Sequence, residues 1–177
     1  SGLANRSYLM AQINSWLTLP STGGIALLKV DLITDAYAQD GDEAGDHLVQ
    51  TLSFRMKELL NDDYTLARIN KSEFMLLSPH ITAVQLQTMG PSLLLMTSEL
   101  QNDPLYIAPV QARVGLVMRN HGDTMTTLLA QADNALMQEK QQLQEPLALF
   151  DVKKQSQASK KVTIGKQQWK ALVEEAI

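Results

Sequence analysis

Residues 66–79 read Leu66-Ala67-Arg68-Ile69-Asn70-Lys71-Ser72-Glu73-Phe74-Met75-Leu76-Leu77-Ser78-Pro79, and this stretch is the strongest guide to the fold. Two apolar runs flank the short polar run Asn70-Lys71-Ser72. Apolar runs separated by a few polar residues are typical of a β-hairpin. The sequence therefore predicts two strands, over about 65–69 and 73–78, joined by a tight turn.

Upstream of the hairpin, the sequence predicts two helices on either side of a strand. Apolar residues recur at helical spacing over about 5–17 and again over about 43–60. Between them, the apolar run 25–30 follows two glycines and is too short for a typical helix. It is expected to be a buried strand. The stretch between Asp31 and Asp40 is assigned no secondary structure.

Downstream of the hairpin, a third helix is expected, with its apolar stripe ending at Leu100. Gly90-Pro91 interrupts it, and an interior proline costs about 3 kcal/mol, so a kink or break is expected there. Residues 111–119 alternate in polarity and predict a strand whose wetter side carries Arg113 and Arg119. A helix over 124–143 and a strand over 147–150 are expected to follow.

This order of elements predicts an α+β fold, a ferredoxin-like central mixed sheet flanked by helices. We expect one domain over 1–151, followed over 152–177 by a polar linker and a short helix. Trp169, Leu172 and Val173 lie on the apolar face of that helix. Two interpretations of the helix stay open: it folds back on this domain, or it begins the next one.

The composition of the 177-residue chain narrows the classes of function. A hydrophobic content of 45% supports one globular core, and the net charge of −4 gives no electrostatic reason to expect nucleic-acid binding. The lack of cysteine excludes disulfides, thiolate zinc sites and a cysteine nucleophile. The three histidines share no ligand spacing, so neither a metal nor a cofactor is predicted. No apolar run approaches the roughly 20 residues of a membrane-spanning helix.

Five short motifs resemble those of the GGDEF family, the diguanylate cyclases, and they occur in the family's order up to about Asp151. They are Gly2-Leu3-Ala4-Asn5-Arg6, Leu27-Leu28-Lys29-Val30-Asp31, Ala44-Gly45-Asp46, the hairpin, and Ala132-Asp133-Asn134-Ala135-Leu136 with Lys140. The resemblance implies the cyclase-palm fold. It also implies that Asp31 stands at a metal-binding position and Lys140 at a phosphate-facing one.

The hairpin turn departs from the family at the positions that carry the chemistry. The family has two glycines and a carboxylate where this chain has Asn70, Lys71 and Ser72, so only Glu73 and Phe74 match. The family's Asp-x-Asp pair, its guanine-reading Phe-Lys-x-x-Asn-Asp stretch and its inhibitory Arg-x-x-Asp motif are also missing. Condensing two GTP molecules requires divalent cations held by carboxylates. We therefore expect no cyclase activity, no catalytic residue and no metal site.

The resemblance implies a catalytically inactive GGDEF domain that acts as a regulatory module in cyclic-di-GMP signalling. In GGDEF–EAL receptors of the LapD type, such a domain packs on an EAL domain of the same polypeptide and holds it in an autoinhibited state. Trp169, Leu172 and Val173 would then contribute to the interdomain contact. The domain is expected on the cytoplasmic side of the bacterial inner membrane, attached only through flanking segments, with a homodimer as a further option.

Three alternative functions stay open. The first is a GTP sensor that activates a linked phosphodiesterase, with Asp31, Lys71 and Lys140 as its surviving nucleotide contacts. The second is an active cyclase with an aberrant signature. The third is a CsrD-like regulator of RNA turnover, against which the acidic net charge argues.

Single residues also have two interpretations each. Asp31 is either a vestigial metal ligand or a solvated cap, and Glu73 is either a nucleotide contact or an exposed hairpin carboxylate. Lys140 either meets phosphate or simply complements the dipole at the end of its helix.

Overall fold

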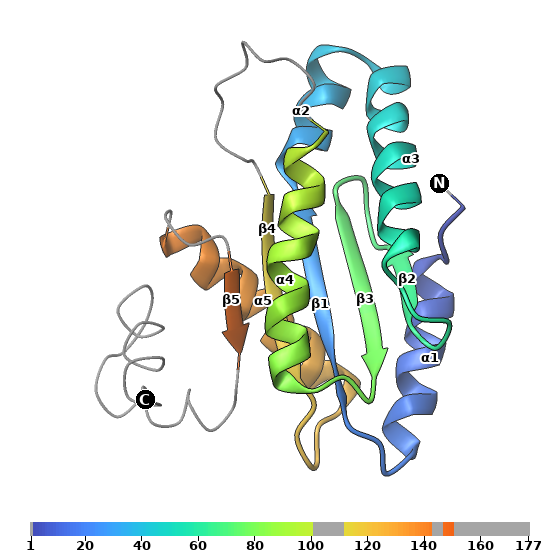
Figure 1. The fold of residues 1–177 in the computed structure, drawn as a ribbon, viewed down its shortest axis with the longest axis vertical. Coiled ribbons are helices and arrows are strands. Elements are labelled where there is room, and N and C mark those ends of the chain that lie inside the picture. The colour runs from blue at the N-terminus through green and yellow to red at the C-terminus, as the bar shows by residue number, and fades with distance from the viewer. Residues whose placement is uncertain (1, 101–111, 143–146, 151–177) are drawn as a thin grey trace.

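The computed structural model describes residues 2–100, 112–142 and 147–150, which form an α+β fold around one mixed sheet (Figure 1). Its elements are α1 (Arg6–Thr18), β1 (Gly23–Val30), α2 (Asp31–Gln39), α3 (Asp42–Glu58), β2 (Thr65–Arg68), β3 (Glu73–Pro79), α4 (Ala83–Ser98), β4 (Ala112–Met118), α5 (Met125–Gln142) and β5 (Leu147–Phe150). The strand order is β2-β3-β1-β4-β5, with β5 parallel to β4 and the other neighbours antiparallel. The predicted fold class and the hairpin are confirmed.

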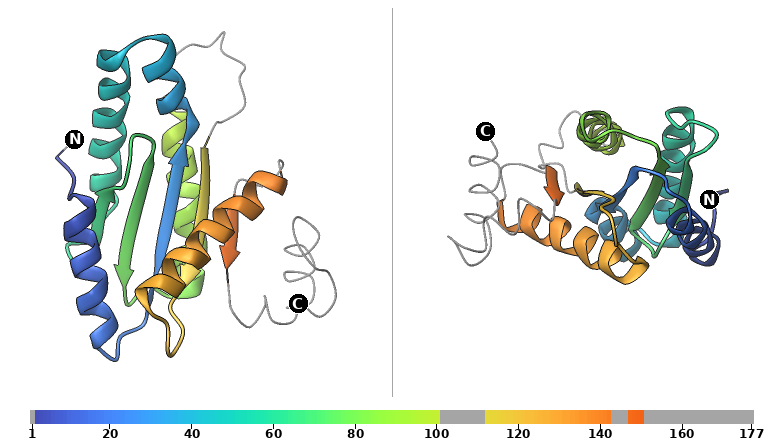
Figure 2. Two further views of the ribbon diagram at one scale, coloured as in Figure 1. Left: turned by 180° about the vertical axis from the view of Figure 1, so that it is seen from behind. Right: turned by 90° about the horizontal axis from the view of Figure 1, so that it is seen from below.

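Helices cover both faces of the sheet, which explains its nearly continuous apolar strands. Helices α1 and α5 lie against one face, and α3 and α4 lie on the other (Figure 2). Every residue of β1 except Lys29 is buried as a result. At Gly115 of β4 the backbone of α5 comes so close that an added Cβ would lie 2.9 Å from the Ala132 oxygen and the Leu136 nitrogen. A side chain at this position would separate α5 from the sheet.

Side chains fix both ends of α1. At its start, Asn5 Oδ1 accepts a hydrogen bond from the Tyr8 N–H at 2.8 Å and so caps the helix. At its end, the Arg119 guanidinium donates to the carbonyls of Trp16 and Leu17 at 2.8 and 3.1 Å. A cation near the last carbonyls also complements the helix dipole. The Arg119 contacts join the end of α1 to the residue that follows β4.

The structure contains one helix that the sequence analysis missed. Helix α2 begins at Asp31, directly after β1, and fills the stretch that was left without secondary structure. Only Ile33 and Ala36 are buried among its nine residues. Two apolar positions cover about one turn, which is too short a pattern to separate a helix from a loop. Asp31 is therefore the first residue of a helix rather than the end of a strand.

A kink or a break was expected at Pro91, and the break is wrong, because α4 runs without interruption from Ala83 to Ser98. The proline ring is exposed on the outer side of the helix, away from the sheet. The opposite side buries Leu86 and Leu93 almost completely. Burial of one such side chain is worth about 2 kcal/mol, so the packing of this face offsets the cost of the proline.

The prediction that one side of β4 faces water is also wrong over most of the strand. Gly115 and Val117 lie on that side, and both are buried. Arg113 is half-buried, and Arg119 lies just beyond the strand. Alternation in the sequence indicated a strand correctly, but a second helix layer covers the side that was expected to face water.

The domain boundary near residue 151 and the apolar tail residues Trp169, Leu172 and Val173 lie outside the described residues. Within the described ranges, no helix combines the length and the apolar character that a bilayer crossing requires.

Candidate functional site

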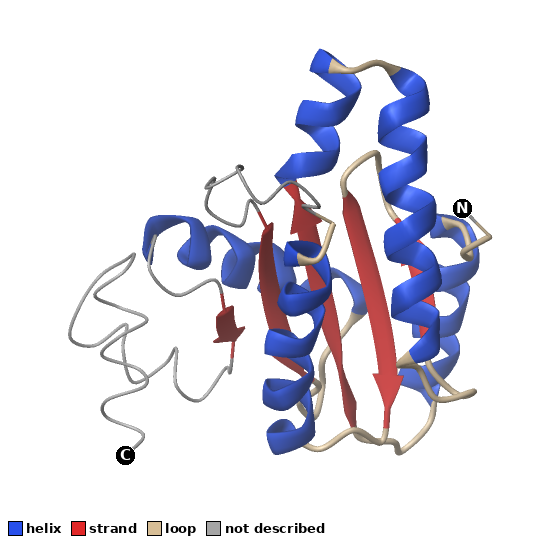
Figure 3. Cartoon of the chain, turned by 45° about the horizontal axis from the view of Figure 1, so that its top comes forward, coloured by secondary structure: helices blue, strands red, loops and turns tan. Residues whose placement is uncertain are grey.

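The hairpin turn lies at the carboxyl end of β1, at the end of the sheet where α2 and α3 meet (Figure 3). The register pairs Lys29 of β1 with Glu73 of β3. Beyond this pair, the Val30 N–H donates to the carbonyl oxygen of Ser72 at 2.9 Å. The turn is therefore joined to the last residue of β1 and lies next to Asp31.

Asn70 organises the turn. Its Oδ1 accepts hydrogen bonds from the backbone N–H groups of Ser72 and Glu73, each at 3.0 Å, and its Nδ2 donates to the Glu73 carboxylate. Side-chain acceptors of this kind stabilise Asx-turns. Among non-glycine residues of the described chain, only His80 has a positive φ, at 66°. Asn70, Lys71 and Ser72 therefore need no glycine-like backbone.

Each carboxylate at this end of the sheet has a positively charged neighbour. Asp31 Oδ2 lies 3.7 Å from Arg113 Nη2, with the Asp31 side chain 42% exposed and the Arg113 side chain 16% exposed. In the sheet register Lys29 stands between Glu73 and Arg113, so these three side chains project from the same face. Ser72 is buried with 6% exposure and carries no charge.

These residues do not fit a divalent cation. Hard cations such as Mg²⁺ need several converging oxygen ligands, including carboxylates. No group of three or more histidine, aspartate or glutamate side chains within the described ranges could hold a metal ion. Asp31 meets a guanidinium at this end of the sheet, where a metal site would need a second carboxylate.

A surface depression of about 550 Å³ lies beside the turn and is lined by residues of α2, α3 and the hairpin. Its lining consists of Tyr37, Asp42, Asp46, Arg68, Asn70 and Lys71. The Tyr37 hydroxyl donates to Asp46 Oδ1 at 2.6 Å and accepts from Arg68 Nη2 at 3.2 Å. The Lys71 ammonium lies 5.2 Å from the centroid of the Tyr37 ring, within cation–π range.

Arg68 connects this tyrosine to the turn backbone. Its Nη2 also donates to the Lys71 carbonyl at 2.8 Å, and its Nε donates to the Asn70 carbonyl at 3.1 Å. Burial and the hydrogen bond to Asp46 raise the pKa of Tyr37, while Arg68 opposes the rise. The phenol therefore stays protonated at neutral pH and keeps donating to Asp46. The network fastens α2 and α3 to the turn.

Gly45 makes this arrangement sterically possible. A Cβ at Gly45 would lie 2.4 to 2.5 Å from atoms of the Tyr37 ring. Real Cβ atoms do not approach carbon so closely, so the ring occupies the space that a side chain at position 45 would need. The Ala44-Gly45-Asp46 motif thus supplies both the space for Tyr37 and the acceptor for its hydroxyl.

The structure brings most of the sequence-predicted site residues together. Asp31, Asn70, Lys71, Ser72 and Glu73 all lie at the same end of the sheet. Phe74 is different, because it is 1% exposed and belongs to the core. Lys140 lies in α5, and its side chain is outside the described part of the structure, as are the tail residues 169, 172 and 173.

The sequence analysis missed the partners that decide what this site can do. Arg113 was expected only to face solvent, whereas it approaches Asp31. Tyr37 fell in the unassigned stretch, and Arg68 was treated as an ordinary strand residue. The polar alternation of β4 was a signal for Arg113, but no local pattern indicated the Tyr37 network.

Comparison with known proteins shows which family the chain belongs to. Residues 1–146 match the family model described as diguanylate cyclase, GGDEF domain. The chain belongs to the GGDEF family. This confirms the family predicted from the five motifs.

Among solved structures, the chain is similar to Vibrio cholerae LapD S helix–GGDEF–EAL bound to c-di-GMP, with 32% identity and a TM-score of 0.77. The match covers 99% of this chain and 40% of that S helix–GGDEF–EAL chain. The apo form of the same LapD region gives a TM-score of 0.75. The expected likeness to a LapD-type GGDEF domain is thereby confirmed.

Two further similar proteins are a diguanylate cyclase and a GGDEF domain solved with c-di-GMP. Diguanylate cyclase VdcA of Vibrio cholerae serotype O1 is 23% identical over 144 residues, which cover 79% of this chain and 42% of VdcA. The GGDEF domain of DgcB from Caulobacter crescentus, solved in complex with c-di-GMP, is 18% identical with a TM-score of 0.72 and covers 84% of this chain and 92% of its own. The chain spans less than half the length of LapD and of VdcA.

Proposed function

We propose that this chain is a catalytically inactive GGDEF domain that serves as a regulatory and interaction module in a cyclic-di-GMP signalling protein. The observation that carries the proposal is the environment of Asp31. Its carboxylate lies 3.7 Å from the Arg113 guanidinium, and the neighbouring turn position is the uncharged, buried Ser72.

Charge explains why this arrangement opposes cyclase chemistry. Two triphosphates can approach each other only when cations neutralise them and activate the attacking hydroxyl. A carboxylate that already faces a guanidinium offers little net negative charge to a second cation. Lys29 and Arg113, on the same face of the sheet, add further repulsion toward Mg²⁺.

The space beside the turn supports the same conclusion. Tyr37, Arg68 and Lys71 hold one another by hydrogen bonds and a cation–π contact in the depression next to the turn. A nucleotide base entering there would have to displace the Tyr37 hydroxyl from Asp46. Binding would then cost at least the free energy of the hydrogen bonds that are broken.

The partner we propose is an EAL domain of the same polypeptide, on whose surface this domain packs to hold an autoinhibited state. The similarity to the LapD GGDEF–EAL structures supports this assignment. A module without an active site can still shift such an equilibrium, provided that its contacts differ between the two states by a few kcal/mol. Attachment to the cytoplasmic side of the inner membrane would come from other segments of that protein.

Calorimetric titration with Mg²⁺ and then GTP tests the proposal, using the Asp31→Asn variant as a matched control. We expect no binding tighter than millimolar and no difference between the two proteins, because Asp31 no longer serves as a ligand. Micromolar affinity for GTP would support the GTP-sensing alternative, which Lys71 at the depression favours. A Mg²⁺-dependent heat that disappears in Asp31→Asn would contradict the proposal.

A further inference from the structure

Helix α4 lies in the outer layer of the domain but carries no charge. Its 16 residues, AVQLQTMGPSLLLMTS, include no aspartate, glutamate, lysine or arginine, whereas the neighbouring α3 has charged residues in its first and last turns. Helix α4 packs on β1 and β4, and its other side faces outwards (Figure 2). The solvent side of a surface helix normally carries charged residues. The outer side of α4 is therefore unlike an ordinary solvated face and is a candidate contact surface.

Four exposed residues of α4 have the spacing of a coiled-coil seam. They are Val84, Thr88, Pro91 and Leu95, which we call the α4 seam. Val84 is 73% exposed and Leu95 is 62% exposed. The steps of four, three and four residues are those of alternating d and a positions in a heptad. At about 100° per residue, the α4 seam spans an arc of about 60° opposite the buried Leu86, so it forms one narrow stripe.

Two exposed glutamines border the α4 seam without covering it. Gln85 and Gln87 lie on opposite sides, about 90° and about 70° from the middle of the seam. The Gln85 Oε1 accepts the Thr82 N–H at 3.0 Å in the capping box, which directs this side chain toward the start of the helix. The glutamines occupy the e and g positions of the same heptad, where coiled coils carry polar side chains. They therefore fit a seam with polar borders.

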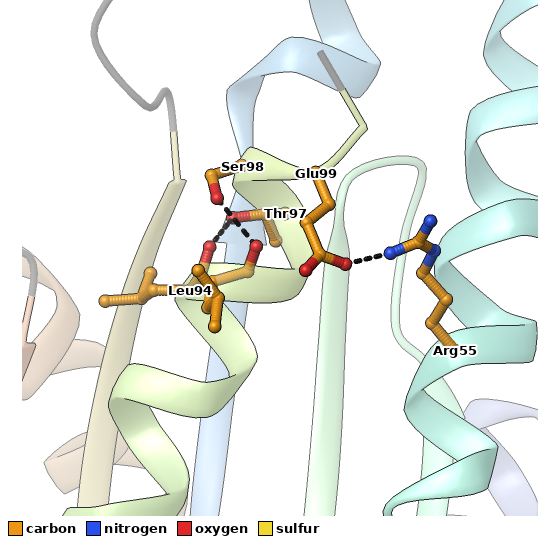
Figure 4. A network of polar contacts seen from close by, with 6 residues as sticks. Arg55, Leu94, Thr97, Ser98 and Glu99 are labelled. Carbon is orange, nitrogen blue, oxygen red and sulfur yellow. Dashed lines mark hydrogen bonds and ion pairs between the residues drawn. The ribbon is translucent and has the colours of Figure 1, made fainter. Parts of the chain in front are cut away.

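Polar contacts fix the C-terminal end of α4 and direct charge away from the seam. Figure 4 shows Glu99, just after the helix, in an ion pair with Arg55 of α3. The Thr97 hydroxyl donates to the carbonyl of Leu94 at 2.6 Å. Glu99 is the charged residue nearest to Leu95 in the sequence, and it points toward α3. The seam thus lies on a helix whose end is anchored, and it stays uncharged along its length.

The α4 seam is complementary to itself when two copies meet in antiparallel orientation. A two-fold axis that passes between positions 89 and 90 places Val84 opposite Leu95 of the second copy. Thr88 then lies opposite Pro91 of the second copy. An interface around a two-fold axis uses the same patch on both chains, so any charge on the patch meets its own kind. In a chain of net charge −4, an uncharged seam avoids this repulsion.

We propose that the α4 seam is a dimer contact, in which α4 packs antiparallel against α4 of a second copy of this chain. The helix is about 24 Å long and about 10 Å wide, so each copy contributes a footprint of roughly 240 Å². Stable interfaces bury about 800 Å² on each partner, so the contact is weak and depends on concentration. Tethering two copies in a larger assembly would strengthen it through the effective concentration. The inference does not depend on the loss of cyclase activity.

Disulfide formation in the cysteine-free chain tests the pairing of the two helices. In the antiparallel dimer, position 84 of one copy adjoins position 95 of the other, whereas the two copies of position 84 are about 16 Å apart. A Val84→Cys chain is mixed with a Leu95→Cys chain under mild oxidation, and each chain is also oxidised alone. We expect the mixed disulfide to form at least tenfold faster than either disulfide between identical chains.

A second mixture provides the control for chance collisions. It replaces Leu95→Cys with Met137→Cys, at a residue that is 60% exposed on α5. No preference for the mixed disulfide is expected there. Equal rates in the two mixtures would overturn the proposal, and so would faster pairing between identical Val84→Cys chains, which indicates a parallel arrangement or none.

Sedimentation equilibrium measures the association of chains that lack cysteine. Leu95→Glu is expected to lower the association constant at least tenfold, because it buries an unpaired carboxylate in the seam. Met137→Glu adds the same charge on α5 and should change the constant much less. Adding Val84→Lys to Leu95→Glu should restore association, since each new ammonium then faces a new carboxylate of the second copy.

Two results of sedimentation would overturn the proposal. The first is a natural chain that stays monomeric up to about 1 mM, a free energy of association weaker than about 4 kcal/mol. The second is an equal loss of association in Leu95→Glu and Met137→Glu, with far-UV circular dichroism showing that both chains are folded. Neither experiment involves GTP, so this inference and the proposed function can fail separately.

Discussion

At the scale of single residues, a side chain organises the hairpin turn. Asn70 accepts two backbone N–H groups, and none of the three turn residues has a positive φ. A turn organised by a side chain does not require glycines that permit left-handed backbone. The hairpin therefore forms without the two glycines that the family pattern expects at this turn.

The turn should lose stability when the Asn70 acceptor is removed. Asn70→Ala deletes the bonds to the Ser72 and Glu73 N–H groups, and each such bond is worth about 1 kcal/mol. We expect a loss of about 1–2 kcal/mol in the free energy of unfolding, measured by urea denaturation. Asn70→Asp in a Glu73→Gln background keeps the acceptor oxygens without placing two carboxylates together, and should lose much less. An equal loss in both variants would show that the acceptor does not hold the turn.

Because of Tyr37, the free energy of unfolding should depend on pH in the alkaline range. Its pKa is raised in the folded chain, so the protonated phenol is favoured by folding. This contribution is fully present below the unfolded pKa of about 10 and is lost as pH rises through the folded pKa. The difference in urea midpoint between the natural chain and Tyr37→Phe should therefore stay constant below about pH 10 and shrink as the pH rises above it. A difference that stays constant over the whole range would contradict the assignment of the shift.

The sequence identified the turn and Asp31 but not the partners that change their chemistry. Asn70, Lys71, Ser72 and Asp31 stood at positions that a family pattern marks. Arg113 reaches Asp31 only because β4 lies beside β1, and that pairing depends on strand register. A contact of this kind cannot be predicted from local spacing.

At the scale of elements, α2 and α3 are fitted to each other through Tyr37 and Gly45. Glycine inside a helix normally lowers stability by about 1 kcal/mol relative to alanine. Here a Cβ at position 45 would come within 2.4 to 2.5 Å of the Tyr37 ring. The sign of a glycine-to-alanine change should therefore depend on what occupies position 37.

A double-mutant cycle tests this dependence. Gly45→Ala alone is expected to lower the free energy of unfolding by about 1–3 kcal/mol through overpacking. In the Tyr37→Ala background the same change should raise stability by up to about 1 kcal/mol. Urea denaturation of the natural chain, the two single variants and the double variant gives the coupling free energy between positions 37 and 45. If Gly45→Ala has the same effect in both backgrounds, the ring does not occupy the space beside Gly45.

The elements themselves were largely predictable, and the errors have two causes. Helix α2 was missed because its two buried residues make too short a pattern. At Pro91 and on the outer side of β4, packing against other elements outweighed what local propensity and alternation predicted. Long periodic stretches such as α5 and the hairpin strands carried enough repeats to be identified.

At the scale of the whole molecule, a cyclase-type sheet carries a guanidinium and a lysine at the end where metal-binding carboxylates would be needed. Asp31 faces Arg113, Lys29 lies between Arg113 and Glu73, and Ser72 is uncharged. The fold needs none of these side chains for its core, so the scaffold would persist without the cyclase chemistry that we propose is lost. A domain of the kind we propose would act through its surface.

The central claim is that this scaffold does not make cyclic dinucleotide, and GTP turnover tests it most directly. The purified chain is incubated with GTP and Mg²⁺ or Mn²⁺, with an active GGDEF cyclase as the positive control, and products are separated by chromatography. Our account predicts no c-di-GMP above a heat-inactivated sample. Formation of c-di-GMP at an appreciable rate that is lost in Asp31→Asn would contradict it.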